Sequence, residues 1–278
     1  YRMNNSIVPK LSAPLVSDQS NVEEYYIFAT CRICNLDHEN IKFIKKIKNV
    51  HSNYYTINGN NLYTQPVNYT HKLSDVLDSI IYHKGLYDNT MIEHVLFKQM
   101  FFLHDGLSEY INPNTHPLSS NKSIIYNKCI LEIWNLDEYI FKDGPFKNKN
   151  LPFKIESVHR THPFNQKDLY HIKELSENET HEKIRLIKNL VSCPILIVGP
   201  YLSLTMPPEV NIKRKRTQQK LKKICELENI EYYDMTEEII KDNTILISAP
   251  GRESHETHFT DQGIKIMSNI VYNFLNKN

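Results

Sequence analysis

The chain has 278 residues, of which 40% are hydrophobic, so it is long enough to bury the core of one sizeable domain. Its 33 basic and 32 acidic residues leave a net charge of +1, which argues against a nucleic-acid partner because such proteins need a clustered basic face. No stretch approaches the ~18 uninterrupted apolar residues of a membrane span, so the sequence predicts no membrane partner.

Residues 1–22 are polar, contain Pro9 and Pro14, and predict an N-terminal arm. They show no positive end followed by an apolar run, so we expect no secretory signal in this stretch. The five cysteines lack disulfide-like spacing, which predicts reduced thiols and a cytoplasmic location. Cys31 and Cys34 have CxxC spacing, but no second pair of ligands lies nearby to complete a zinc site, so we expect no metal.

Strand and helix patterns then alternate along the chain. Apolar and aromatic runs predict strands over 25–30, 50–57, 129–134, 194–200 and 230–235. Helical spacing between and after them predicts helices over 39–48, 70–85, 91–103, 166–190, 214–229 and 261–276. The run 194–200 is nearly all apolar, which is typical of a central parallel strand that is covered on both faces.

Alternation of this kind predicts a three-layer α/β/α sandwich with a five-stranded parallel sheet, flavodoxin-like in outline. We expect a single domain over 23–278, with insertions at about 86–125 and 146–165. In open α/β sheets the site lies beyond the carboxyl ends of the strands, so residues after the strands and before the last helix should meet there. These residues are Thr30, Cys31, Arg32, Gly59, Asn135, Tyr201, His255, Glu256 and His258.

Two stretches of this set resemble the SGNH (GDSL-type) hydrolase superfamily, and most closely its subfamily with Gly-Ser-Cys after the first strand. That block corresponds to 29–32 here, and the family's last block, His-Phe-Thr-x-x-Gly, stands at 258–263. The resemblance covers about 25–278, but only these two blocks are sharp. It implies Cys31 as the nucleophile and His258 as its base. It also implies an oxyanion hole from the main chain at 31 or 32, from Gly59 and from the Asn135 side chain.

The sequence departs from the family pattern at three positions, one of which is the first-block glycine, replaced here by Ala29 or Thr30. Cys31 stands where the family usually has serine, and His255 stands where it has the orienting aspartate, for which Glu256 is a nearby substitute. A thiol needs less activation than a hydroxyl, and a Cys–His pair works without a strong third member. Arg32 would lower the pKa of Cys31 or bind an anionic substrate, and Thr30 and Tyr201 would complete the substrate-binding wall.

The resemblance predicts an esterase that removes an acyl group, above all acetyl, from a sugar or small alcohol without a cofactor. One alternative is a glycan O-acyltransferase that uses acetyl-CoA or a similar donor at the same site. Another is an inactive relative that binds a glycan or a protein partner. The sequence carries no signal for an oligomeric state.

Structural interpretations stand beside these functional ones. Cys31 could be a small buried residue at a strand end, and His258 could cap the last helix or bond a loop carbonyl. Asn135 could bond only its local turn, and His255 could be a solvated loop residue. The basic run 213–216 could be a solvated helix start or an anion contact. The other four cysteines are expected to be structural.

Overall fold

The computed structural model describes residues 25–29, 33, 47–49, 54–57, 60–63, 72–86, 126–144, 147–150, 170–248 and 256–277. The expected arm 1–22, most of the expected insertions and the expected helix over 91–103 lie outside the described residues. The same holds for five of the candidate site residues: Thr30, Cys31, Arg32, Gly59 and His255.

The main sheet has seven strands in the order β4-β3-β2-β1-β5-β8-β9. Their bounds are Tyr25–Phe28 (β1), Ile47–Asn49 (β2), Tyr54–Ile57 (β3), Asn60–Tyr63 (β4), Lys128–Glu132 (β5), Ile195–Val198 (β8) and Glu231–Tyr233 (β9). Parallel pairings join β2, β1, β5, β8 and β9 in turn, whereas β3 and β4 extend the β2 edge as antiparallel strands. The predicted α/β class with a parallel sheet is confirmed.

The expectation of a five-stranded parallel sheet is wrong, and the shortness of the connections between the edge strands explains why. The predicted strand 50–57 is β3, which follows β2 after the short connection 50–53 and precedes β4 after 58–59. Parallel neighbours need a crossover of a dozen or more residues, so connections this short permit only antiparallel pairing. The sheet is therefore mixed.

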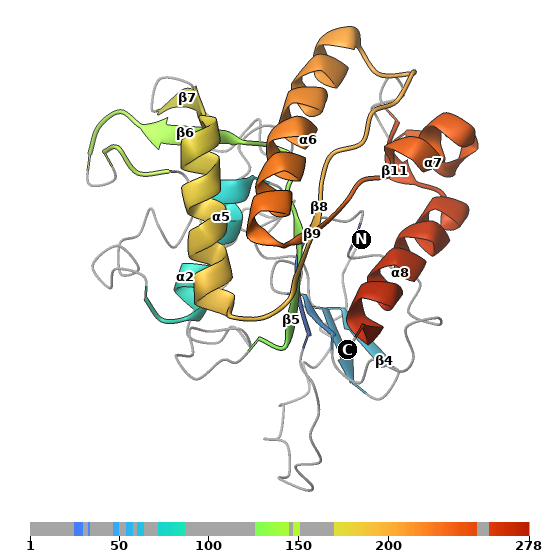
Figure 1. The fold of residues 1–278 in the computed structure, drawn as a ribbon, viewed down its shortest axis with the longest axis horizontal. Coiled ribbons are helices and arrows are strands. Elements are labelled where there is room, and N and C mark those ends of the chain that lie inside the picture. Colours follow the sequence, from blue (N-terminus) through green and yellow to red (C-terminus); the bar gives the residue numbers. More distant parts are fainter. Residues whose placement is uncertain are drawn as a thin grey trace, which may run out of the picture.

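Helices cover both faces of the sheet (Figure 1). Their bounds are Leu73–His83 (α2), Glu177–Val191 (α5), Pro208–Glu228 (α6), Thr236–Lys241 (α7) and Asp261–Asn276 (α8), with a short 3-10 helix at Asn243–Ile245. Side chains alternate along each strand, so Ile130 joins an apolar cluster with α7 and α8, while Cys129 and Leu131 join another with α2, α5 and α6. No described helix is both long and apolar enough to cross a bilayer.

Two predicted helices differ from the structure at their starts. The first part of the expected helix 166–190 is wrong: Tyr170–Glu174 form strand β7, which pairs antiparallel with Asp137–Phe141 (β6). The helix begins only after Ser176, whose hydroxyl accepts from the Glu179 N–H while the Glu179 carboxylate accepts from the Ser176 N–H. Helix α6 begins at Pro208 rather than at 214, because proline is well suited to the first helical position. The last helix, 261–276, is confirmed.

Candidate functional site

A recess lies at the carboxyl ends of β1, β5 and β8. Among its lining side chains are Ile33, Glu132, Trp134, Phe259 and Met267. Its side chains pack so closely that no part of the recess is wide enough to hold a water molecule. The recess therefore joins the segment after the first strand to the segment before the last helix by direct packing, at the edge of the sheet where α/β proteins place their sites.

Glu132 is the one acidic residue in this lining, and it is fully buried at the end of β5. It is paired in register with Val198, and alternation along β5 puts it on the same face as Ile130, toward α8. Burying a carboxylate costs several kcal/mol unless it is paired, so such a group is retained for a structural or a functional reason. Our sequence analysis missed Glu132, although a single charge inside the apolar run 129–134 was a usable signal.

The block 258–263 contains three residues whose roles in folding are clear. Phe259 is buried with its ring 5.6 Å from that of Tyr201. The Thr260 hydroxyl caps α8 by accepting from the Gly263 N–H. A Cβ at Gly263 would lie 2.6 Å from the main-chain oxygen of Ile245, so only glycine allows this close approach.

His258 has a different position in that block. It lies on strand β11 (Glu256–Phe259), opposite Ile247 of β10 (Leu246–Ser248), in a ribbon that we had not predicted. Residues paired across a ribbon share a face, and Ile247 is 51% exposed, so half-buried His258 lies on the outer face while Phe259 points inward. Thr260 is the cap of α8, so the interpretation of His258 as its cap is wrong.

Two further candidate residues are described, and both have structural contacts. Tyr201 is 1% exposed and packs edge-on against Trp134, with ring centroids 4.8 Å apart, so it is a wall of the recess. Asn135 bonds its local turn, because its side-chain oxygen accepts from the Asp137 N–H at 2.8 Å. The Asn135 main-chain oxygen accepts from the Leu73 N–H, which attaches the start of α2 to the end of β5.

The argument that put Gly59 at the same edge fails. The strand that leads to it, β3, runs antiparallel to β2, so β3 ends at the amino edge of the parallel strands. Glu256 begins β11, and the structure describes its main chain only. Of the expected site, the described residues thus bring Tyr201 and the 258–263 block together, with Ile33 and Glu132 beside them.

The basic run 213–216 is not simply solvated. The Lys213 ammonium pairs with Asp137, and the Arg214 guanidinium lies 4.7 Å from the Trp134 ring and 5.2 Å from the Tyr201 ring. An Arg214 Nη1 proton is also donated to the Tyr201 main-chain oxygen at 3.2 Å. Arg214 therefore covers two walls of the recess from outside, while Lys215 and Arg216 are exposed beside it.

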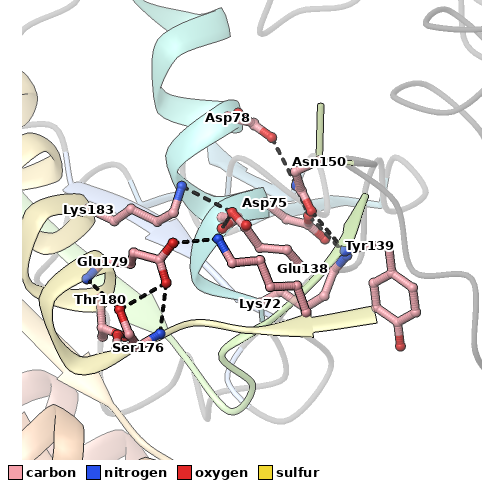
Figure 2. A network of polar contacts seen from close by, with 12 residues as sticks. Lys72, Asp75, Asp78, Glu138, Tyr139, Asn150, Ser176, Glu179, Thr180 and Lys183 are labelled. Carbon is pink, nitrogen blue, oxygen red and sulfur yellow. Dashed lines mark hydrogen bonds and ion pairs between the residues drawn. The ribbon is translucent and has the colours of Figure 1, made fainter. Parts of the chain in front are cut away.

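A second group of buried charges lies where α2, α5 and β6 meet (Figure 2). We call its members the buried polar network: Lys72, Asp75, Asp78, Glu138, Asn150 and Lys183. Ammonium–carboxylate distances are 3.2 Å for Lys72–Asp75 and 3.1 Å for Lys183–Glu138. The Asn150 amide donates to Asp75 at 2.9 Å and to Asp78 at 3.1 Å.

The network carries one carboxyl group more than it has ammonium groups. Burial raises the pKa of Asp78 to about 7, and the nearby Asp75 carboxylate adds to this effect. Near neutral pH Asp78 is partly protonated, so the network approaches charge balance. This is expected of a group of residues that holds α2, α5 and the β6–β7 hairpin together. Across the described part of the chain, no group of three or more His, Cys, Asp or Glu side chains is arranged to hold a metal ion.

Comparison with known proteins adds no family assignment. No protein-family model matches this chain, and no curated protein matches its sequence.

Proposed function

We propose that the chain is an SGNH-like acyl hydrolase in which Cys31 attacks an acetyl ester of a sugar or small alcohol and His258 transfers the protons. One observation carries this proposal: Ile33 and Phe259, close neighbours of those two residues in the sequence, line one recess. They are more than two hundred residues apart in the chain, and the sheet brings them together at its carboxyl edge.

The order of the parallel strands supports the finer fold assignment. Numbered along the chain, the parallel strands run 2-1-3-4-5 across the sheet, which is the order of flavodoxin-like domains. Such sheets bind ligands beside the first strand, where the order reverses. We therefore assign an SGNH-like, flavodoxin-type α/β domain to which β3 and β4 are added at one edge.

The proposed reaction has two steps. In the first, His258 accepts the Cys31 proton, the sulfur attacks the acyl carbon, and the leaving alcohol takes the proton as a thioester forms. In the second, His258 draws a proton from water, the hydroxide attacks the thioester, and acetate leaves as the Cys31 thiol is restored. Main-chain N–H groups at 31 and 32 and the Asn135 amide stabilise the oxyanion, each contributing about 3 kcal/mol.

We assign Glu132 as a positioning residue for the segment that follows β1. It lines the recess beside Ile33, two residues after Cys31, whereas His258 lies on the outer face of its ribbon. Its role is to hold the segment that carries Cys31 in the geometry that attack requires. No substrate contact is assigned to it.

Release of p-nitrophenol from p-nitrophenyl acetate tests the proposal. The wild-type chain should show a burst followed by turnover, and the acetyl group should be found on Cys31 by peptide mass mapping. Cys31→Ala should abolish both signals, and His258→Ala should lower the rate by about a hundredfold or more. Cys34→Ala is the matched control, because it removes a thiol three residues away and should leave the rate unchanged.

The absence of release by wild-type protein, or equal release by Cys31→Ala, would defeat the hydrolase. One observation favours the acyltransferase as second candidate: the Arg214 guanidinium lies against the Trp134 and Tyr201 walls of the recess, where a cation suits the phosphates of an acyl-CoA donor. Acetyl-CoA should then raise the melting temperature, and Arg214→Gln should weaken that effect. The free thiols of Cys129, Cys193 and Cys225 suit the reducing cytosol in which we place the protein.

A further inference from the structure

Two cysteines far apart in the sequence meet at the amino ends of the central strands. The Cys193 sulfur lies 3.7 Å from the Cys129 sulfur, across a sequence separation of 64 residues. The Cys129 N–H donates to the Pro194 main-chain oxygen at 3.0 Å, and Cys129 is paired in register with Ile195. The main chain therefore holds the two residues side by side.

The two sulfurs differ in their access to solvent. Cys129 is fully buried on the face of β5 toward α2 and α5, whereas Cys193 is half-buried in the short connection between α5 and β8. Burial and the bond from Cys193 raise the pKa of Cys129 above its usual range. A soluble oxidant can therefore reach Cys193 first, and Cys129 is placed as the second thiol.

We propose that Cys129 and Cys193 form a reversible disulfide when the chain meets a low-molecular-weight disulfide such as oxidised glutathione. A disulfide needs its sulfurs at about 2.0 Å, so the pair has to close by less than 2 Å. This site lies at the opposite end of the strands from the recess and does not depend on the proposed hydrolase.

The exchange balances in two steps. The Cys193 thiolate attacks one sulfur of oxidised glutathione, which forms a mixed disulfide and releases one glutathione thiolate. The Cys129 thiol then gives up its proton, and its sulfur attacks the Cys193 sulfur and releases the second glutathione. Two protein thiols are oxidised and one glutathione disulfide is reduced to two thiols. Because Cys129 holds its proton tightly, the second step should be the slower one.

The product would join the start of β5 to the segment before β8 across 64 residues. Closing a loop of that length restricts the unfolded chain, so the oxidised protein should melt roughly 5 °C or more above the reduced one. Reduction with dithiothreitol should return the original melting temperature.

Incubation of the full chain with oxidised glutathione, followed by intact-mass measurement and non-reducing peptide mapping, tests the proposal. In wild-type protein the Cys129 and Cys193 peptides should appear as one linked species that is two hydrogen atoms lighter than the two peptides together. Cys193→Ser should yield no link to Cys129. Cys129→Ser should accumulate one glutathione on Cys193, because no second thiol is there to displace it.

Cys225→Ala is the matched control, since it removes another buried thiol and should leave the link intact. Three outcomes overturn the proposal: no modification of Cys193 in wild-type protein, a mixed disulfide that never closes, or a link that uses a different partner. Cys193→Ser changes a half-buried residue, so the test survives even if the buried Cys129→Ser substitution impairs folding.

Discussion

Buried carboxyl side chains lie in two regions toward the carboxyl side of the sheet, and the two regions differ in the side chains that surround them. Asp75 and Glu138 of the buried polar network lie within 3.2 Å of lysine ammonium groups. Glu132 instead lines a recess whose other side chains are apolar or aromatic. The charges of the buried polar network attach helices to the sheet, whereas Glu132 lies at the carboxyl edge of the sheet, where α/β proteins place their sites. The contrast predicts that substitutions in the buried polar network lower stability and that substitutions at Glu132 in the recess lower activity.

Lys72→Met should have the largest effect on stability. Lys72 is 4% exposed and its partner Asp75 is fully buried, so the substitution leaves a buried carboxylate without its cation. The free energy of unfolding should fall by about 3 kcal/mol, measured by urea denaturation. Lys223→Met is the control, because that lysine and its partner Glu177 are both exposed, so the change should cost less than about 1 kcal/mol. Equal losses in the two variants would contradict a structural role for the network.

Asp78 should make stability depend on pH. Its native pKa of about 7 exceeds its ordinary 3.8, so the folded state binds the proton more tightly than the unfolded chain. The stability from this group is full below about pH 4 and is lost as the pH rises through about 7. Three pKa units correspond to about 4 kcal/mol, and partial solvent access reduces this to about 2 kcal/mol.

Asp78→Asn removes that titration. The variant should match wild type near pH 3.5 and exceed it by about 2 kcal/mol near pH 8, measured by denaturation at each pH. Asp143→Asn, at an exposed position, should keep the wild-type profile. If the stability of wild type does not fall relative to that of Asp78→Asn as the pH rises, the native pKa of Asp78 is not raised.

Glu132→Gln should separate the two regions most clearly. The amide keeps the shape of the side chain, so the melting temperature should change little, while ester hydrolysis falls about tenfold as the segment that carries Cys31 loses its position. The pH profile of Cys31 alkylation should shift upward in the same variant. Glu138→Gln is the counterpart and should lower stability with activity intact. Full activity and an unchanged pH profile in Glu132→Gln would remove its positioning role.

Ser176→Ala should have the smallest effect, at the edge of the network. It removes the hydroxyl that caps α5, the helix that carries Lys183 (Figure 2). The loss should be about 1 kcal/mol, with activity unchanged. Glu182→Ala, an exposed change within the same helix, should stay within about 0.5 kcal/mol of wild type. A loss of activity after Ser176→Ala would contradict the claim that the network affects stability alone.

The sequence predicted those elements whose burial leaves a periodic pattern. Strand β8 is buried along its whole length. Helix α8 follows its cap Thr260 and carries an apolar stripe. Strand β7 was missed because four of its five residues are exposed, so no apolar alternation marks it. The ribbon β10–β11 was missed for another reason: the sequence of each strand does not show which other segment it pairs with.

The candidate site was predictable to a similar degree. A resemblance to a family motif identified the 258–263 block, and packing now accounts for its Phe259, Thr260 and Gly263. Glu132 could not be assigned a place, because the face it occupies follows from strand pairing and not from its neighbours in the chain. Gly59 itself lies outside the described residues, and the argument for its position failed because the direction of β3 depends on the length of the connections before and after it.

The rate at which iodoacetamide alkylates Cys31, followed by peptide mass mapping at several pH values, tests the central claim most directly. An ordinary thiol is only about 1% thiolate at about pH 6.5, whereas a thiol that shares its proton with a histidine is largely thiolate. We predict alkylation of Cys31 at that pH at least tenfold faster than in His258→Ala. Identical rates in the two proteins, or a Cys31 that reacts only as an ordinary thiol does, would contradict the account.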